Sequence, residues 1–198
     1  NEIGVIQDIA AIGQIAKENN ICFFCDATQA AGKLPIDVVD NDIDLLCLSA
    51  HKMNGPKGIG ALYIKSGIKL TPLLHGGAQE KGMRGGTYNT PLIVGFGEAA
   101  RIAFEEFDAR VHQMLEQRDK WQAYFEDQDI GVVQFKDTFR APHILSVQVK
   151  TDAEDFLMMN ATQFAASTGS ACNAALMEVS HVLKAIGNES GNVIRISV

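Results

Sequence analysis

Two side chains of opposite charge follow two separate apolar runs of the sequence. Asp26 comes directly after residues 21–25, and Lys52 follows residues 45–49 by three positions. Short apolar runs bounded by turn-forming residues are typical of buried strands, and in open α/β sheets ligands bind beyond the carboxyl ends of the strands. We therefore expect this carboxylate and this amine to face one pocket.

The pairing of these two groups indicates a particular cofactor. A lysine amine can form a Schiff base with an aldehyde, and an aspartate can keep a pyridine nitrogen protonated. Pyridoxal 5'-phosphate (PLP) needs both, because its charged ring accepts electrons from a substrate carbanion. Ser49 and His51, beside Lys52, and Thr87 offer hydrogen bonds to phosphate oxygens. Judged alone, Asp26 could be a helix N-cap and His51 an ordinary loop histidine.

One of the four cysteines lies in a setting that suits a reactive thiol. Cys22 and Cys25 have C-x-x-C spacing, but on a strand residues so spaced point to opposite faces, which disfavours a shared metal ion. Cys47 is interpreted as a small buried hydrophobic residue. Cys172 lies in the polar segment "STGSACN", where a thiol would be exposed. The histidines show no metal-ligand spacing, so we predict no metal site.

The elements that must position these groups alternate as in α/β proteins. Apolar spacing predicts helices over 7–18, 91–127, 152–159 and 178–186, and strands over 21–25, 45–49, 59–64, 131–135, 144–149 and 193–198. The first three strands are expected to be buried on both faces. Residues 75–87 carry five glycines, which predicts an irregular loop with free backbone amides. We expect a domain boundary inside the long helix, near residue 107.

Composition limits the classes of function. The 198 residues are 46% hydrophobic, which is enough for a buried core, and the net charge is −7. No run of lysine or arginine offers a footprint for a phosphate backbone, so we expect no direct nucleic-acid ligand. No apolar stretch approaches the roughly 20 residues that span a bilayer, and we expect a cytoplasmic protein with no membrane segment. The chain does not start with methionine, so we expect it to be cut from a longer one.

Five motifs occur in order along the chain: "NEIGVIQDI", "CDATQAAGKLPID", "SAHKMNGPKGIGALY", "HGGAQEKGMRGGT" and "STGSACNAALMEVSHVLKAIG". Together they resemble the PLP-dependent cysteine desulfurases of the NifS/IscS-like group, within the fold-type I class V aminotransferases. The resemblance implies an α/β fold with the C-terminal part of a large mixed-sheet, PLP-binding domain over 1–106. A smaller α/β domain over 107–198 would carry the cysteine loop. The phosphate-binding turn and ring-stacking histidine that relatives carry upstream are not found in these residues.

The resemblance implies a role in PLP binding for several residues. Lys52 would form the Schiff base with the cofactor. Asp26 would bind the pyridine nitrogen, and Gln29 would bind the ring hydroxyl. Ser49 and His51 would hold the phosphate.

The remaining implied roles concern the substrate and a second subunit. Thr87 would reach the PLP phosphate of the partner across a homodimer. Asn1 would lie near the ring and the substrate, and Arg195 would anchor the substrate carboxylate, which a guanidinium binds with two hydrogen bonds. Judged alone, Arg195 could equally form a surface ion pair. Cys172 would be the nucleophile, although the residue after it, Asn173, is commonly threonine in relatives.

The implied reaction is the conversion of L-cysteine to L-alanine, with Lys52 as the base and a persulfide formed on Cys172 for a sulfur-acceptor protein. Iron–sulfur cluster assembly, tRNA thiolation and DNA phosphorothioation all remain open as destinations of the sulfur. One alternative is an aminotransferase or selenocysteine lyase, in which Cys172 would be dispensable. Another is a non-catalytic fragment of the same fold. No phosphate-binding glycine motif follows a strand, which disfavours a nucleotide-binding domain.

Overall fold

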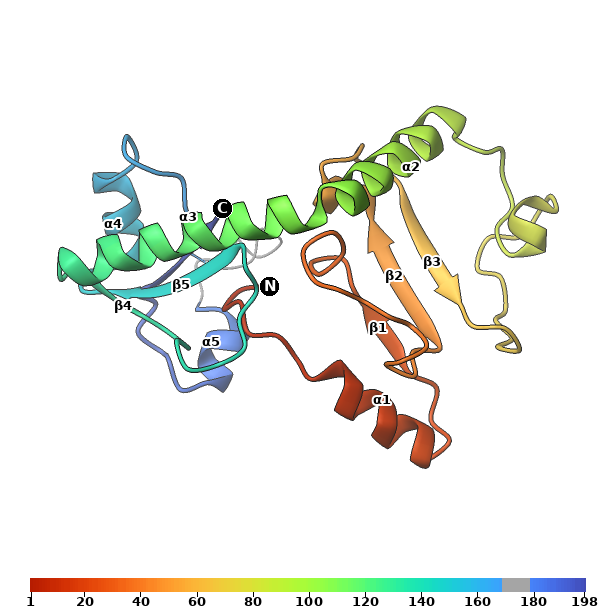
Figure 1. Ribbon diagram of the computed structural model, residues 1–198, viewed down its shortest axis with the longest axis horizontal. Coiled ribbons are helices and arrows are strands. Elements are labelled where there is room, and N and C mark those ends of the chain that lie inside the picture. The colour runs from red at the N-terminus through yellow and green to blue at the C-terminus, as the bar shows by residue number, and fades with distance from the viewer. Residues whose placement is uncertain (169–178) are drawn as a thin grey trace. The chain divides into compact units, whose positions relative to one another are not determined.

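The computed structural model of the chain describes residues 1–168 and 179–198 (Figure 1). Two compact units make up this part of the chain. Residues Asp8–Phe107 form one, here called the lysine unit, and Asn1–Gln7 together with Asp108–Val198 form the other, here called the arginine unit. Each unit contains a three-stranded sheet and helices, so the mixed α/β architecture that the sequence predicts is confirmed.

The lysine unit is built on the sheet order β1-β2-β3. Its elements are α1 (Ile9–Glu18), β1 (Phe24–Asp26), β2 (Leu45–Ser49), the short 3₁₀ helix η1 (Ala50–Met53), β3 (Gly60–Ile64), the 3₁₀ helix η2 (Gln79–Gly82) and α2 (Thr90–Glu105). Strands β1 and β2 are parallel, with Phe24 opposite Leu45, whereas β2 and β3 are antiparallel. The two longer helices begin at side-chain caps: the Ala11 N–H donates to the Asp8 carboxylate, and the Leu92 N–H donates to Asn89.

Strand β1 begins later than the apolar run predicts. Asn20 takes a left-handed conformation, with φ of 55°, and the Ile21 N–H donates to the Ala16 carbonyl at 2.8 Å. The left-handed residue and this hydrogen bond end α1, and they keep the backbone of residue 21 in the turn after the helix. Regular pairing with β2 therefore starts only at Phe24, and Cys22 lies outside the strand.

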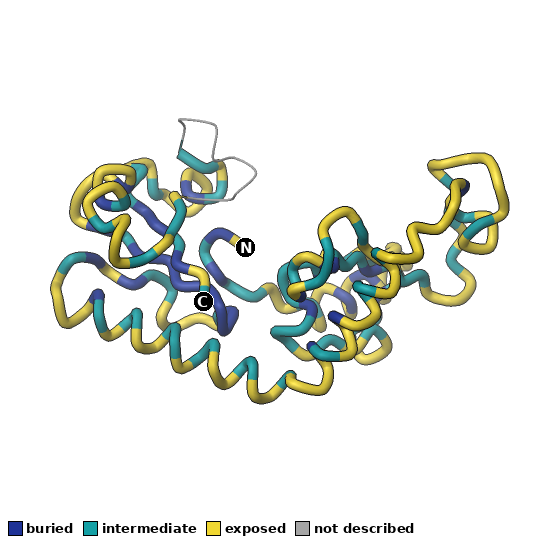
Figure 2. Tube along the Cα trace, turned by 90° about the horizontal axis from the view of Figure 1, so that it is seen from above, coloured by how far each residue is buried: buried dark blue, intermediate teal, exposed yellow. Residues whose placement is uncertain are grey.

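The prediction that the first three strands are buried on both faces is wrong for the described residues. Phe24 is 54% exposed and Leu62 is 48% exposed, while Leu46 and Ile43 are buried. Figure 2 colours the chain by burial and shows exposed, intermediate and buried positions along it. Side chains alternate between the two faces of a strand, and only one face packs against the cluster formed by Ala27, Ile43 and Leu46. An apolar run predicts a strand. It does not predict that residues of this unit bury both faces of that strand.

The arginine unit is built on a second sheet, β4-β5-β6, in which both pairings are antiparallel. Its elements are α3 (Phe107–Asp127), β4 (Gly131–Val133), β5 (Ile144–Val149), α4 (Ala153–Met159), α5 (His181–Ala185) and β6 (Val193–Ser197). Helix α3 runs along β4 and β5 in Figure 1 and contributes Phe125, which is fully buried against Val147 and Ile194. Phe125 also packs against the rings of Phe156 and Phe164, so aromatic contacts join α3 to the segments after β5.

The single helix predicted over 91–127 is two helices. Helix α2 ends at Glu105, and the Glu106 N–H donates to the Ile102 carbonyl at 2.9 Å before α3 begins at Phe107. Residues on both sides of Glu106 have helical apolar spacing, and no glycine or proline marks the break. The periodicity therefore contains no signal for it.

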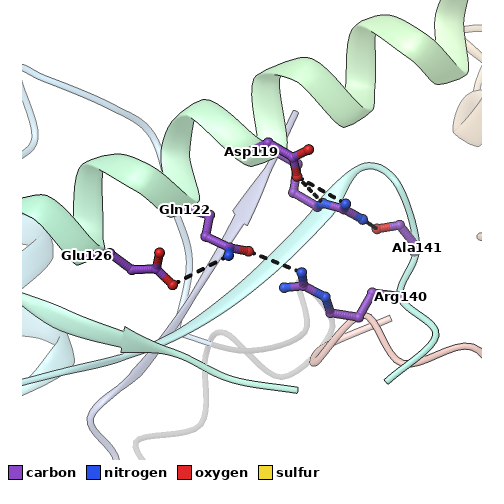
Figure 3. A network of polar contacts seen from close by, with 6 residues as sticks. Asp119, Gln122, Glu126, Arg140 and Ala141 are labelled. Atoms are coloured by element: carbon purple, nitrogen blue, oxygen red, sulfur yellow. Dashed lines mark hydrogen bonds and ion pairs between the residues drawn. The ribbon is translucent and has the colours of Figure 1, made fainter. Parts of the chain in front are cut away.

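Polar contacts fix α3 to the loop between β4 and β5 (Figure 3). Arg140 donates to the Gln122 side chain at 3.1 Å, and Gln122 donates to Glu126 at 3.4 Å. Arg118 donates to the Ala141 carbonyl at 3.4 Å. Burial, followed by the charge of Arg118, lowers the pKa of Arg140. These contacts hold the 139–141 segment in place.

The first seven residues pack against that same segment. The Ala141 N–H donates to the Gly4 carbonyl at 2.8 Å, and the Ile6 N–H donates to the Phe139 carbonyl at 2.9 Å. Gly4 has a φ of 77°, and a Cβ there would come within 3.0 Å of the Ile144 side chain, so the close approach needs glycine. This docking places Asn1 in the arginine unit.

No helix in the described part of the chain is both long and apolar enough to cross a membrane.

Candidate active site

Asp26 and the residues before Lys52 leave the sheet at the same edge. Strands β1 and β2 are parallel, and Asp26 lies opposite Cys47, two residues before the end of β2 at Ser49. The Ala27 N–H donates to the Cys47 carbonyl at 3.1 Å, which continues the pairing past Asp26. Because both strands end here, the turn after Asp26 and the turn that carries Lys52 start side by side. This is the edge at which α/β sheets bind ligands.

Asp26 is held as a carboxylate by neighbouring donors. Hydrogen bonds from the hydroxyl and the backbone N–H of Thr28 lower the pKa of Asp26, with a smaller contribution from the Cys47 thiol. The Thr28 N–H lies 2.9 Å from Asp26 Oδ1. Partial burial opposes the shift but does not cancel it. A charged, solvent-reachable carboxylate is the group that a protonated pyridine nitrogen requires.

Cys47 and Thr28 are partners of Asp26 that the sequence reasoning missed. Burial, and then the hydrogen bond to Asp26, raise the pKa of the Cys47 thiol, so it keeps its proton and can donate it. Cys47 is therefore a hydrogen-bond donor as well as a small strand residue. The signal for Thr28 was present in "DAT", because an aspartate commonly accepts a bond from the N–H two residues later.

Lys52 lies on a tight turn with its side chain partly exposed. Helix η1 is followed by Asn54 in the left-handed conformation, with φ of 62°, and the Gly55 N–H donates to the Ala50 carbonyl at 2.9 Å. A Cβ at Gly55 would lie 2.9 Å from both the Ala50 carbonyl oxygen and the Ala99 side chain, so this turn is packed closely on α2. The backbone that carries Lys52 is thus fixed on both sides.

Neither Asp26 nor Lys52 is committed to a salt bridge within the described residues. Beside them, Ser49 Oγ and His51 Nδ1 lie 2.8 Å apart. This bond engages Nδ1 and orients the imidazole, so the hydroxyl and the Nε2 of the ring could together bind an anionic group.

Two further predicted residues belong to the lysine unit. Gln29 lies in the turn after Asp26, and its side chain is partly exposed. Thr87 is exposed at the end of the 75–87 loop. Some amides of that loop are not free, because the N–H groups of Gly85 and Gly86 donate to the Leu74 carbonyl and the Gln79 side chain.

Arg195 and Asn1 meet in the arginine unit. Arg195 lies in β6, opposite Ser146 of β5, and its Nη1 donates to the Asn1 carbonyl at 3.3 Å. Its Nε is buried without a hydrogen-bond partner among the described residues, and its side chain forms no salt bridge with them. Burial lowers the pKa of Arg195, while the charge of Glu2 opposes that shift. The alternative of a surface ion pair therefore finds no support, and the guanidinium retains donors for a carboxylate.

Apart from Thr87 in the 75–87 loop, the predicted residues thus fall into three groups. Asp26, Ser49 and the Lys52 turn share one edge of the lysine unit, with Gln29 in the adjoining turn. Asn1 and Arg195 are in contact in the arginine unit. Cys172, the predicted nucleophile, lies outside the described residues. Among the residues that are described, no group of three His, Cys, Asp or Glu side chains could hold a metal ion.

The donor set of the lysine unit fits PLP. The carboxylate of Asp26 suits the pyridine nitrogen, the uncommitted amine of Lys52 suits the aldehyde, and the bonded pair of Ser49 and His51 suits the phosphate. The pyridine nitrogen, the aldehyde and the phosphate of the cofactor therefore each have a counterpart in this unit.

Comparisons with known proteins agree with this chemistry. The chain is 46% identical over 189 residues to "Cysteine desulfurase IscS" of Methylococcus capsulatus, covering 94% of this chain and 47% of the relative. A NifS-like protein from Rickettsia africae has a similar structure, with a TM-score of 0.87 and 29% identity, over 100% of this chain and 53% of the other. A structure described as "SspA in complex with cysteine" gives a TM-score of 0.80 and 38% identity, over 100% of this chain and 56% of the other.

The chain spans about half the length of the curated relatives that it matches. Enzymes of the class V aminotransferase family and cysteine desulfurases depend on PLP, which is the cofactor that the donor set fits. The family model for "Aminotransferase class-V" matches residues 1–198. Because the match runs from the first residue to the last, this chain belongs to the class V aminotransferase family.

Proposed function

We propose that the protein containing this chain is a PLP-dependent cysteine desulfurase, which converts L-cysteine to L-alanine and passes the sulfur on. The observation that carries the proposal is the 46% identity, over 94% of the chain, to a curated cysteine desulfurase. The solved structure in complex with cysteine adds support, because its fold matches the whole chain at 38% identity.

The lysine unit would bind the cofactor. When bound, PLP supplies an aldehyde for linkage to an amine and a ring that stabilises negative charge on the substrate carbon. Lys52 would provide the amine and would then move the proton at the substrate Cα. Asp26 would keep the pyridine nitrogen protonated, and Gln29 would donate to the ring hydroxyl. Ser49 and His51 would hold the phosphate.

The substrate would be bound and cleaved by groups from other segments. Arg195 would hold the carboxylate of L-cysteine through two parallel hydrogen bonds, near Asn1. The thiolate of Cys172 would attack the substrate sulfur, so that a sulfur–sulfur bond forms while the bond from sulfur to Cβ breaks. The carbon fragment would take a proton and leave as alanine. Cys172 would then carry a persulfide.

The wider setting of the enzyme is also a proposal. Residues 1–106 would be the C-terminal part of a large PLP-binding domain, with Asn1–Gln7 packed in the same compact unit as the small domain. Residues 107–198 would be that small domain, which carries the cysteine loop. The enzyme would be a cytoplasmic homodimer in which Thr87 of one subunit donates to the PLP phosphate of the other. A sulfur-acceptor protein would take the sulfur from Cys172.

Mass spectrometry of the holoenzyme after incubation with L-cysteine tests the proposal. We expect the peptide that contains Cys172 to gain one sulfur atom, and borohydride treatment before turnover to attach PLP to Lys52. A Cys172→Ser variant should lose sulfur transfer, whereas Cys22→Ser, at an exposed cysteine, should keep it. Full-rate sulfide release by Cys172→Ser would instead indicate a lyase that does not use this thiol.

A further inference from the structure

Lys33 makes an unusual contact with the backbone of Lys52. Its ammonium donates to the Lys52 carbonyl oxygen at 2.6 Å, in a partly buried position. No described carboxylate forms a salt bridge with Lys33. Burial, followed by the nearby charge of Lys52, lowers the pKa of the Lys33 amine. Burying a cation without a counter-ion costs free energy. A role in solubility therefore does not explain why Lys33 is partly buried at this position.

The contact joins the two turns that leave the β1–β2 edge. Lys33 follows the turn after Asp26, where the Ala31 N–H donates to the Ala27 carbonyl at 2.9 Å. Lys52 belongs to η1, the turn after β2. The Lys33 bond is therefore a direct polar link from the segment of Asp26 to the backbone of Lys52.

Apolar packing brings the same two turns together beside this bond. Ala31 and Met53 are buried in one cluster with Ala103 of α2. Gly32 has a φ of 72°, and a Cβ there would lie 3.4 Å from Met53 and 3.1 Å from Ala103. The backbone next to Lys33 thus lies directly against the residue after Lys52. Packing sets the distance between the turns, and the ammonium fixes the orientation of the Lys52 peptide group.

We propose that Lys33 is a positioning residue that holds the Lys52 turn in register with Asp26, so that the Lys52 amine meets the PLP aldehyde. The inference rests on the proposed PLP role of Lys52 and extends it to a residue outside the set that contacts the cofactor. Lys33 acts through the backbone of Lys52 and takes no part in proton transfer.

The test compares Lys33→Met with a matched control in the holoenzyme. Methionine keeps the length of the apolar stem but removes the donor, so Lys33→Met should fold and lose the bond. Lys69→Met, at an exposed lysine of the same unit, is the control. At equal bound PLP, we expect the fraction of Lys52 linked to PLP after borohydride reduction, measured by peptide mass spectrometry, to fall at least threefold in Lys33→Met only. Lys33→Arg, which keeps a cationic donor, should recover at least half of the wild-type fraction.

A second measurement does not depend on the cofactor. In PLP-free protein, hydrogen exchange at the amides of residues 50–55 should be faster in Lys33→Met than in wild type or Lys69→Met, while the thermal midpoints stay close. If Lys33→Met does not fold, Lys33→Gln takes its place, because it removes the charge and its side chain is one bond shorter, which draws the remaining donor back from the Lys52 carbonyl. A linked fraction below the wild-type value in Lys33→Gln supports the proposal, and a wild-type fraction overturns it.

The outcomes separate the two proposals. If wild type links PLP to Lys52 and Lys33→Met links just as much, Lys33 is not a positioning residue although the proposed function stands. If wild type links no PLP, the proposed function fails, and the exchange rates alone decide whether Lys33 fixes the Lys52 turn. Unchanged exchange in Lys33→Met overturns that role.

Discussion

Asp26 remains a carboxylate because donors from its own turn and from the neighbouring strand point at it. Thr28 is the largest contributor, and Cys47 adds a thiol. The donors lie in the turn and the strand that also fix the position of Asp26. The same local structure therefore sets both the charge of Asp26 and its position at the sheet edge. A group prepared in this way can stabilise a cation at the sheet edge without first rearranging.

Thr28→Val should raise the pKa of Asp26, because the hydroxyl donor is lost while the backbone donor remains. A lowered pKa in the folded state contributes stability above the pKa of the unfolded chain, and that contribution is lost as the pH falls through the folded value. The stability deficit of Thr28→Val should therefore be largest at neutral pH and should shrink in acid. NMR titration of the Asp26 carboxyl carbon measures the pKa, with the exposed Thr71→Val as control. An unchanged pKa in Thr28→Val would show that the amide of residue 28 acts alone.

For single residues, the sequence predicts where a residue lies in the fold better than it predicts the hydrogen-bond partners of that residue. That Asp26 and Lys52 share an edge follows from two apolar runs and from the rule for α/β sheets. The thiol of Cys47 and the ammonium of Lys33 could not be assigned to Asp26 and Lys52 in advance. Such partners depend on register and on the packing of two turns, which residue types alone do not specify.

Helices and strands of both units follow their apolar spacing closely, and the errors have specific causes. Strand β2 and strand β5 occupy the predicted residues. Strand β1 starts late because the turn that ends α1, with Asn20 in the left-handed conformation, still includes Ile21. The helical spacing of apolar residues continues across the break at Glu106. Because a hydrophobic pattern reports only this spacing, it cannot predict the break.

Two helical glycines give opposite predictions for the same substitution. A Cβ at Gly13 of α1 would lie 2.0 Å from the Asn41 carbonyl oxygen, so Gly13→Ala must push α1 away from the 37–42 turn. We expect Gly13→Ala to lower the free energy of unfolding by about 3 kcal/mol. A Cβ at Gly97 of α2 meets nothing within 4 Å, so Gly97→Ala should raise it by about 0.5 to 1 kcal/mol through helix propensity.

Urea unfolding followed by circular dichroism measures both changes. Gly97→Ala serves as the matched control, because the chemical change is identical and only the space around the added methyl group differs. Equal effects from the two variants would mean that α1 does not pack on the Asn41 backbone as the structure has it.

On the scale of the whole molecule, large apolar side chains lie exposed on the lysine unit. Ile15, Ile21 and Phe24 are each more than half exposed. Groups of large exposed apolar side chains are uncommon on protein surfaces. All three of these residues lie between the start of α1 and the end of β1. The apolar character of these residues predicted a helix and a strand but did not show which of the side chains stay exposed.

The proposed homodimer makes a prediction about mixed subunits. If Thr87 serves the PLP of the partner, a heterodimer of one Thr87→Val subunit and one Lys52→Ala subunit keeps one complete site, because the intact Lys52 and the intact Thr87 come from different chains. We expect it to show about half of the wild-type activity, whereas both homodimers should be weak or inactive. Tandem-tag purification followed by alanine assays measures this. A heterodimer no more active than the two homodimers would mean that Thr87 serves its own subunit.

The docking of Asn1–Gln7 onto the 139–141 segment also has a consequence for biosynthesis. The ribosome delivers residues in order, so those first seven residues leave the exit tunnel more than a hundred positions before the backbone to which they pair. The lysine unit lies between them in the sequence and is synthesised before the 139–141 segment. Because Asn1–Gln7 pair with the 139–141 segment, the arginine unit can form in full only after the whole lysine unit has been synthesised.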